Sequence, residues 1–233
     1  MKKTCNFFCG LLFFLLSIVL ILSVVQKCCF SRNFYAKELN SEEVEENTGM
    51  DSKDVIAAAD VLLDYLENKR DDIVIQAEVN GSEQEVFNER ETAHMVDVKD
   101  LYQKAVLVRN VLAICTAAGF AILLVINRHH RQAMLQKGYQ AGISLTLLVI
   151  VFLAIWMAAD FSGFWYDFHE LFFTKNDYWL LNPNSSIMIN MFPQDFFEHL
   201  VLRICAISSG LLALLGILLW MPWHRFSFRK VKA

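Results

Sequence analysis

Four uncharged hydrophobic stretches constrain the fold of this chain most. They cover residues 4–26, 110–127, 138–159 and 204–224. Each is close to the roughly 20 residues that a helix needs to cross a bilayer. Inside lipid, only helices and closed barrels can pair all of their backbone polar groups. Because 55% of the residues are also hydrophobic, we predict an all-α polytopic membrane protein with four transmembrane helices.

The charged residues between these stretches divide by sign. Three short segments, 1–3, 128–137 and 225–233, contain Lys and Arg but neither Asp nor Glu. All 25 acidic residues lie in the other, longer connections. Short basic segments stay in the cytoplasm. We therefore predict that the N and C termini are cytoplasmic and that the longer connections are extracytoplasmic, in a multi-pass protein of the plasma membrane.

This layout divides the chain into eight segments. In order, they are a first transmembrane helix with a cytoplasmic N-terminus (1–26), an extracytoplasmic cap with a helix extension (27–109), a second transmembrane helix (110–127), a cytoplasmic loop (128–137), a third transmembrane helix (138–159), an extracytoplasmic aromatic loop (160–203), a fourth transmembrane helix (204–224) and a cytoplasmic tail (225–233). No small-residue cleavage site precedes Cys28, so we expect the first helix to remain uncleaved.

The first long connection is expected to form a small cap over the bundle. Residues 37–51 are polar and acidic without apolar periodicity, which predicts a flexible linker. A helix is expected to begin at Asp51 or Ser52, because apolar residues then recur at helical spacing: Val55, Ala59, Leu62 and Leu66. The run Ile73-Val74-Ile75 and the Asn80-Gly81 turn predict a short strand pair.

Two histidines in the extracytoplasmic connections are candidates for proton chemistry. His94 lies on a helical pattern that runs from about Glu89 into the second span, close to Glu91 and Asp97. His169 lies in the aromatic loop, close to Asp167 and Glu170. A neighbouring carboxylate can orient an imidazole and raise its basicity, as acid–base catalysis requires. The alternative is that both histidines are structural and form hydrogen bonds at the membrane interface.

The aromatic loop favours contact with lipid. Residues 161–197 contain twelve aromatic side chains, and aromatic rings prefer the boundary between water and lipid. Pro183 and Pro193 interrupt regular structure, which predicts short helices lying on the surface. We predict that the following residues contact a lipid-linked substrate: Trp165, Phe168, Phe172, Trp179, Asn182, Phe192 and Phe196.

Metal and disulfide chemistry find less support in the sequence. His94, His169 and the nearby carboxylates could ligate zinc, but no HExxH motif or CxxC pair is present. Cys28 and Cys29 are sequence neighbours, a geometry that rarely closes a disulfide. We predict no metal and no cofactor, and assign no role to these two cysteines.

Several motifs of this chain resemble the lipoprotein intramolecular transacylase (Lit) family. The motifs are Glu91-x-x-His94-Met95-x-Asp97-Val98-Lys99, Phe168-His169-Glu170-Leu171-Phe172-Phe173, Trp179-x-x-Asn182-Pro183 and Phe192-Pro193-x-x-Phe196-Phe197. The four-span layout is also similar. The resemblance implies an acyltransferase that moves the sn-2 acyl chain of a diacylglyceryl-modified lipoprotein onto the α-amino group of its own N-terminal cysteine. It further implies that His94 and His169 are catalytic.

The alternatives come from other classes of protein. One is a non-catalytic membrane protein that binds lipid or lipoprotein, and the other is a metal-dependent intramembrane hydrolase. The expected partners are diacylglyceryl lipoproteins and membrane lipid, with no nucleic acid. The oligomeric state, the acyl-chain preference and the order in which the two histidines act are not predicted.

Overall fold

The computed structural model describes residues 2–221 and is mostly helical. Four of its helices are long and apolar enough to cross a membrane: α1 (Lys2–Cys29), α5 (Glu89–Ile126), α6 (Arg131–Ala159) and α9 (Gln194–Trp220). This confirms the predicted four-helix membrane architecture. Residues 222–224, at the predicted end of the fourth span, and the predicted tail 225–233 lie outside the described residues.

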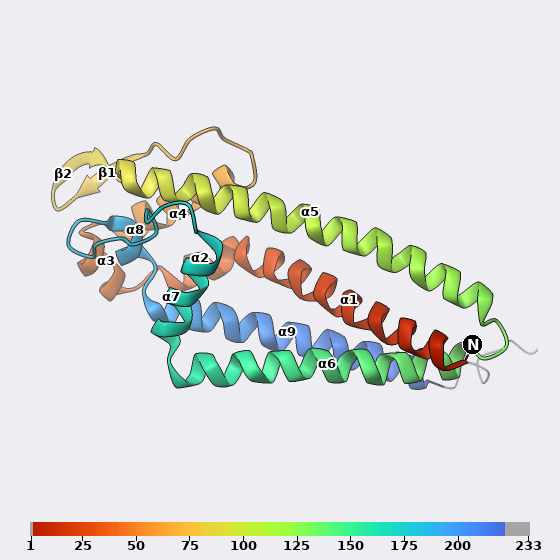
Figure 1. Cartoon of the computed structure of the whole chain (residues 1–233). Coiled ribbons are helices and arrows are strands. Elements are labelled where there is room, and N and C mark those ends of the chain that lie inside the picture. The colour runs from red at the N-terminus through yellow and green to blue at the C-terminus, as the bar shows by residue number, and fades with distance from the viewer. Residues whose placement is uncertain (1, 222–233) are drawn as a thin grey trace, which may run out of the picture. The chain divides into compact units, whose positions relative to one another are not determined.

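The chain divides into two compact units, which we describe separately (Figure 1). Among the described residues, the span unit comprises 2–21, 110–152 and 205–221, and the cap unit comprises 22–109 and 153–204. The cap unit adds the shorter elements α2 (Arg32–Glu38), α3 (Glu42–Thr48), α4 (Ser52–Leu66), β1 (Gln76–Val79), β2 (Ser82–Glu85), α7 (Phe161–Phe172) and α8 (Ile187–Met191).

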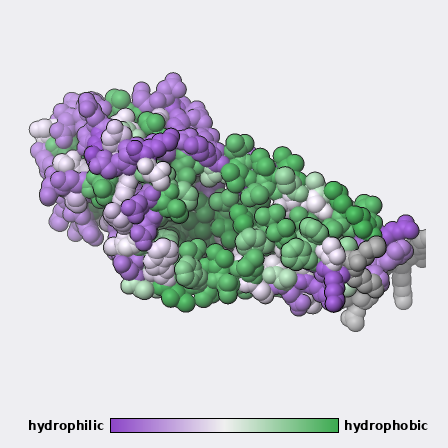
Figure 2. All heavy atoms as spheres, viewed as in Figure 1, coloured by the Kyte–Doolittle hydropathy of each residue, from purple (hydrophilic) through white to green (hydrophobic). Residues whose placement is uncertain are grey.

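In the span unit, small residues let the helices approach closely. A Cβ atom at Gly142 of α6 would lie 2.6 Å from the carbonyl oxygen of Gly10 on α1, so only glycine fits there. The hydroxyls of Ser17 and Thr146, on the same two helices, are 2.5 Å apart. Such contacts replace the hydrophobic effect, which cannot drive helices together in lipid. Figure 2 shows hydrophobic residues over most of the visible surface of this unit, with hydrophilic residues near one end.

The predicted linker at 37–51 is wrong, because this segment is folded. It contains the end of α2 and all of α3, and the side chains of Leu39, Val44 and Met50 are almost completely buried. These few apolar residues are too widely spaced to produce a periodic pattern. Burying each one can still contribute roughly 1.5–3 kcal/mol when a neighbouring helix supplies the other wall. That wall includes α4, which packs against both α2 and α3.

The predicted helix start and hairpin are present in the cap unit. Asp51 caps α4, and its side chain accepts hydrogen bonds from the backbone N–H groups of Lys53 and Asp54. Asn80 and Gly81 connect β1 and β2 with positive φ angles of 51° and 81°, as a tight hairpin turn requires. The strand begins at Gln76, after the predicted run 73–75, because its antiparallel partner β2 has only four residues.

Candidate functional site

The cap unit brings the two candidate histidines together. His94 lies near the start of α5, before its uncharged stretch, and His169 lies on α7. Their ring centroids are 6.1 Å apart, with an angle of 38° between the ring planes. His94 is only 9% exposed, and His169 is partly buried. The structure thus brings together two histidines that are 75 positions apart in the sequence.

Aromatic rings enclose this histidine pair. Trp179 stacks on His169 at 5.1 Å and 26°, and Trp165 meets the same imidazole edge-on at 5.0 Å. Phe173 contacts both histidines, with centroid distances of 5.2 Å to His94 and 5.5 Å to His169. Phe173 is missing from the predicted site, although its position four residues after His169 places it on the same helix face. The rings form an apolar shell around two titratable groups.

Hydrogen bonding determines the tautomer of His169. The Nδ1 atom lies 2.7 Å from the carbonyl oxygen of Trp165. A carbonyl only accepts hydrogen bonds, so Nδ1 carries the proton and the Nε2 of the neutral ring is left with a free lone pair. The Nδ1 atom of His94 is buried and has no hydrogen-bond partner among the described residues. The pair thus offers one oriented base and one imidazole nitrogen without a partner.

Burial favours the neutral form of both imidazoles. Desolvation lowers the pKa of His94 from 6.5 to about 4, repulsion from His169 adds to this effect, and Asp97 opposes it. Burial also lowers the pKa of His169, while its hydrogen bond to the Trp165 carbonyl acts in the opposite direction. At neutral pH both rings are uncharged and able to accept a proton.

The lowered pKa of His94 predicts a loss of stability in acid. A histidine with a depressed folded-state pKa stabilises the protein fully above its unfolded pKa of 6.5, and this contribution disappears as the pH falls toward about 4. Relative to a His94→Asn variant, the wild type is expected to lose on the order of 3 kcal/mol between pH 7 and pH 4. Thermal unfolding of both proteins across this range measures the difference. Parallel pH curves would contradict the assignment.

The four carboxylates predicted to support the histidines do not bond to them. Asp97 instead accepts a hydrogen bond of 2.8 Å from the Asn176 side chain. Asp167 and Glu170 are exposed, and in the described part of the chain neither forms a hydrogen bond or ion pair with a histidine. On α7, the backbone carbonyl of Trp165 takes the place that we expected a carboxylate to occupy, because it lies one helical turn before His169.

Glu91, the fourth of these carboxylates, has a different environment. It is completely buried, and its Oε2 accepts a 2.7 Å hydrogen bond from the backbone N–H of Asn88, whose side chain accepts one in return from the N–H of Glu91. This is a capping box, which an N-x-x-E pattern could have revealed. The Oε1 atom accepts hydrogen bonds from the Ser186 hydroxyl at 2.6 Å and the Met188 N–H at 2.8 Å. Glu91 therefore joins the start of α5 to α8.

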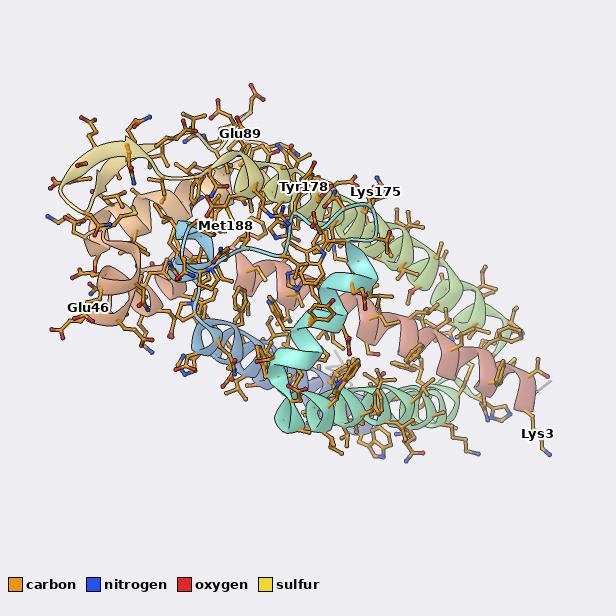
Figure 3. The ribbon with its side chains drawn as sticks, turned by 60° about the vertical axis from the view of Figure 1, so that its left-hand side comes forward. Lys3, Glu46, Glu89, Lys175, Tyr178 and Met188 are labelled. Atoms are coloured by element: carbon orange, nitrogen blue, oxygen red, sulfur yellow. The ribbon has the colours of Figure 1, made fainter. Side chains whose placement is uncertain are left out.

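The connection between α7 and α8 is fastened along α5 at further points. Arg90 forms an ion pair of 3.2 Å with Asp177, and the Asn88 side chain donates to the Ser185 carbonyl. Figure 3 shows Lys175 and Tyr178 of this connection beside α5, with Glu89 at the start of that helix and Met188 on α8. These contacts hold the segment that places Trp179 over His169.

The other predicted substrate-binding residues fall into three groups. Phe168 meets the His169 ring edge-on at 5.3 Å, and the neighbouring Phe172 is about half exposed. Asn182 accepts turn-forming hydrogen bonds from Asn184 and from residues 185–186 and is exposed. Phe192 and Phe196 pack against Tyr35 of α2.

A small cavity opens beside the histidine pair. Its volume is about 130 Å³, and its lining includes Asp97, Phe172, Phe173 and Lys175. Within residues 2–221, no cluster of three or more His, Cys, Asp or Glu side chains is arranged to hold a metal ion. The two imidazoles and the aromatic rings that pack against them are suited to proton transfer.

Comparisons with known proteins agree with this architecture. The family model for the lipoprotein intramolecular transacylase Lit matches residues 10–197. The solved structure of the membrane-integral lipoprotein intramolecular transacylase Lit from Bacillus cereus is similar at 21% identity, with a TM-score of 0.73, covering 94% of this chain and 95% of that chain. Two variants of that protein, in which one histidine is replaced by arginine or by alanine, each match with a TM-score of 0.68 over 94% of this chain.

The family match extends over most of the chain. A comparison of this chain with curated protein sequences found no match. The matched residues include His94, His169, all of α5 and α6, and most of α1. The chain thus belongs to the lipoprotein intramolecular transacylase (Lit) family and is a membrane-integral acyltransferase that acts on lipoproteins.

Proposed function

We propose that this acyltransferase moves the sn-2 acyl chain of a diacylglyceryl-modified lipoprotein onto the α-amino group of the same N-terminal cysteine, with His94 and His169 as acid–base catalysts. The observation that carries the proposal is the pair of uncharged imidazoles 6.1 Å apart inside an aromatic shell. One ring has its Nδ1 engaged by a backbone carbonyl, and the other has a buried Nδ1 with no partner.

The reaction requires two proton transfers. An α-amino group with a pKa of about 7.7–8.0 is mostly protonated at neutral pH and cannot attack an ester in that form. In our proposal, the free Nε2 of His169 accepts the amine proton while nitrogen bonds to the ester carbonyl carbon. The bond between this carbon and the sn-2 oxygen then breaks. The nitrogen loses its second proton, which passes through His94 to the departing glycerol oxygen, while the proton on His169 is released to solvent. The product is an N-acyl, S-monoacylglyceryl cysteine.

Positioning is the other contribution that we assign to the protein. Amine and ester belong to one molecule, yet they must meet through a strained medium-sized ring. Holding reacting groups in register can lower a barrier by roughly 7–11 kcal/mol in favourable cases. In the proposal, the exposed ring of Phe172 and the face of Phe168 hold acyl chains, while Trp165 and Trp179 keep water from His169.

We also propose that this site faces the extracytoplasmic side, which the segregation of all 25 acidic residues supports. In a background in which the six native cysteines are replaced by alanine, Lys175→Cys is expected to react with an impermeant thiol reagent in intact cells. Gln132→Cys, in the basic segment 128–137, is expected to remain unlabelled until the membrane is opened. Labelling of the Gln132→Cys variant alone would reverse the orientation.

Mass spectrometry of lipoprotein N-termini tests the reaction. In cells that otherwise make diacyl lipoproteins, expression of this protein is expected to leave the total lipoprotein mass unchanged, because an intramolecular transfer relocates a chain without adding or releasing one. Fragment spectra are expected to show an amide-linked acyl group on the cysteine and a single ester on its glyceryl unit. Blocking the α-amine beforehand is expected to abolish the change.

Two other results would assign a different function. A mass decrease equal to one fatty acid, without N-acylation, would indicate a hydrolase. Unchanged fragment spectra would indicate a protein that binds lipoprotein without reacting with it. An increase by one acyl chain would indicate transfer from an external donor.

A further inference from the structure

A second, larger cavity lies in the cap unit, away from the histidine pair. Its volume is about 520 Å³, and it is formed by α2 and the early turns of α9. Asn33, Lys37 and Glu38 line it from α2, and His199 and Arg203 line it from α9. None of these residues takes part in the proposed acyl transfer, so the cavity calls for a separate explanation.

Positive charge exceeds negative charge in this cavity. Its single carboxylate, Glu38, is shared by His199, whose Nδ1 lies 2.7 Å from it, and by Lys37, whose Nζ lies 3.8 Å from it. Arg203 has no carboxylate partner among the described residues, and its guanidinium carbon lies 5.3 Å from the centre of the Phe34 ring. Lys37 and Arg203 are thus two fixed cations beside one carboxylate. An anionic ligand would restore the balance.

The position of Arg203 indicates which anion is available. It is the last charged residue before the uncharged stretch 204–224 of the fourth span. At a rise of about 1.5 Å per residue, its side chain starts within a few ångströms of the hydrocarbon boundary, where long basic side chains reach toward lipid headgroups. Beside it, Leu202 is 66% exposed and also lines the cavity. One wall therefore suits a phosphate and the other suits an acyl chain.

We propose that this cavity binds an anionic membrane phospholipid, with its phosphate held by Arg203 and Lys37 and its acyl chain lying along Leu202. The planar guanidinium can donate two parallel hydrogen bonds to a phosphate, and the ammonium of Lys37 adds a point charge. Asn33 supplies a side-chain amide for the headgroup. The bound lipid would join α2 to α9 and is distinct from the lipoprotein substrate.

Lipid titration of the full-length protein in a neutral detergent tests this site. The probes are phosphatidylglycerol and phosphatidylcholine with identical acyl chains, and native mass spectrometry measures how much of each is bound. Phosphatidylglycerol is expected to bind more tightly. Arg203→Gln and Lys37→Gln are each expected to reduce this preference by about fivefold or more, since a basic residue near an anionic headgroup contributes on the order of 1 kcal/mol.

Lys27→Gln is the matched control, because it removes the same charge from an exposed lysine next to the first span and outside the cavity. It is expected to leave the lipid preference unchanged. Lys37 is 82% exposed, so its replacement tests the site even if Arg203→Gln perturbs the packing on Phe34. Arg203→Lys is expected to keep part of the preference.

Three results would overturn the proposal. Equal binding of the two lipids would remove the charge selectivity on which it rests. If Lys27→Gln reduced the preference for phosphatidylglycerol as much as the cavity variants do, the preference would come from the general positive charge of the surface and not from this cavity. Full competition by millimolar inorganic phosphate would indicate a site for a free anion, because a phospholipid also gains from its acyl chain.

Discussion

Replacing His169 by asparagine is expected to lower the rate of acyl transfer about 10²–10⁴-fold, the usual contribution of one acid–base group. The substitution is well matched to the structure. The side-chain N–H₂ of asparagine can still donate to the Trp165 carbonyl, as the His169 Nδ1 does at 2.7 Å, but the basic Nε2 is lost. The expected loss is in turnover, with little change in substrate affinity. Single-turnover rates on a diacyl lipopeptide in liposomes, followed by mass spectrometry, measure it.

His94→Asn is expected to produce a loss of similar size, because its imidazole is proposed to serve the other proton transfer. The double variant is expected to transfer the acyl chain only slightly more slowly than the less active single variant, because the effects of removing groups that act as a unit are not additive. His130→Asn, an exposed histidine of the segment 128–137, is the control. A loss of only about twofold in either single variant, with the protein folded and in the membrane, would remove that histidine from the mechanism.

The second large effect is expected at Glu91. Glu91→Ala removes a buried carboxylate that accepts hydrogen bonds from Asn88, Ser186 and Met188, and it leaves those donors without partners. Hydrogen bonds to charged groups contribute roughly 1.5–3 kcal/mol each, and unpaired buried groups are costly, so a destabilisation of about 3 kcal/mol is expected. Thermal unfolding of the purified protein measures it. Activity is expected to fall as well, because the connection that carries Trp179 is released from α5.

Glu89→Ala is the control for this effect, because Glu89 lies in the same helical turn and carries the same charge, but it is exposed. Its replacement is expected to cost only about 0.3–1 kcal/mol through the helix dipole. Equal unfolding midpoints for the two variants would show that the hydrogen bonds of Glu91 to Asn88, Ser186 and Met188 do not stabilise the protein. If Glu91 instead supported His94 chemically, Glu91→Gln would lower turnover while leaving the unfolding midpoint unchanged.

The spacing of charged, apolar and turn-forming residues in the sequence was enough to predict the membrane helices and several local elements. Uncharged runs of 18 to 23 residues can only cross a membrane as helices, and the part of the chain that the structure describes contains four such helices. Local hydrogen bonding likewise made the start of α4 at Asp51 and the Asn80-Gly81 turn predictable. The histidines could be selected as candidates because carboxylates lie close to each of them in the sequence, and because the motifs around them resemble a known family.

Only the tertiary structure decided what each polar group meets. The proximity of His94 and His169 depends on how α5 and α7 pack, and no sequence pattern encodes a distance across 75 residues. His169 bonds to a backbone carbonyl in place of the predicted carboxylate. Glu91 caps the start of α5 and joins it to Ser186. Residues that are close in the sequence need not be in contact in the fold. A buried polar group forms hydrogen bonds with the donors or acceptors that packing places beside it.

The dependence on distant partners also explains why the folded segment that contains α3 and the end of α2 was predicted to be a linker. Leu39, Val44 and Met50 form no amphipathic pattern in an acidic segment, so the sequence resembles a linker. They become buried because nearby helices cover them, and much of the favourable free energy comes from that distant surface. The sequence by itself determined which segments enter lipid and which residues could carry chemistry, because composition and local spacing control both. Only the folded chain determined their partners, because these lie far apart in the sequence.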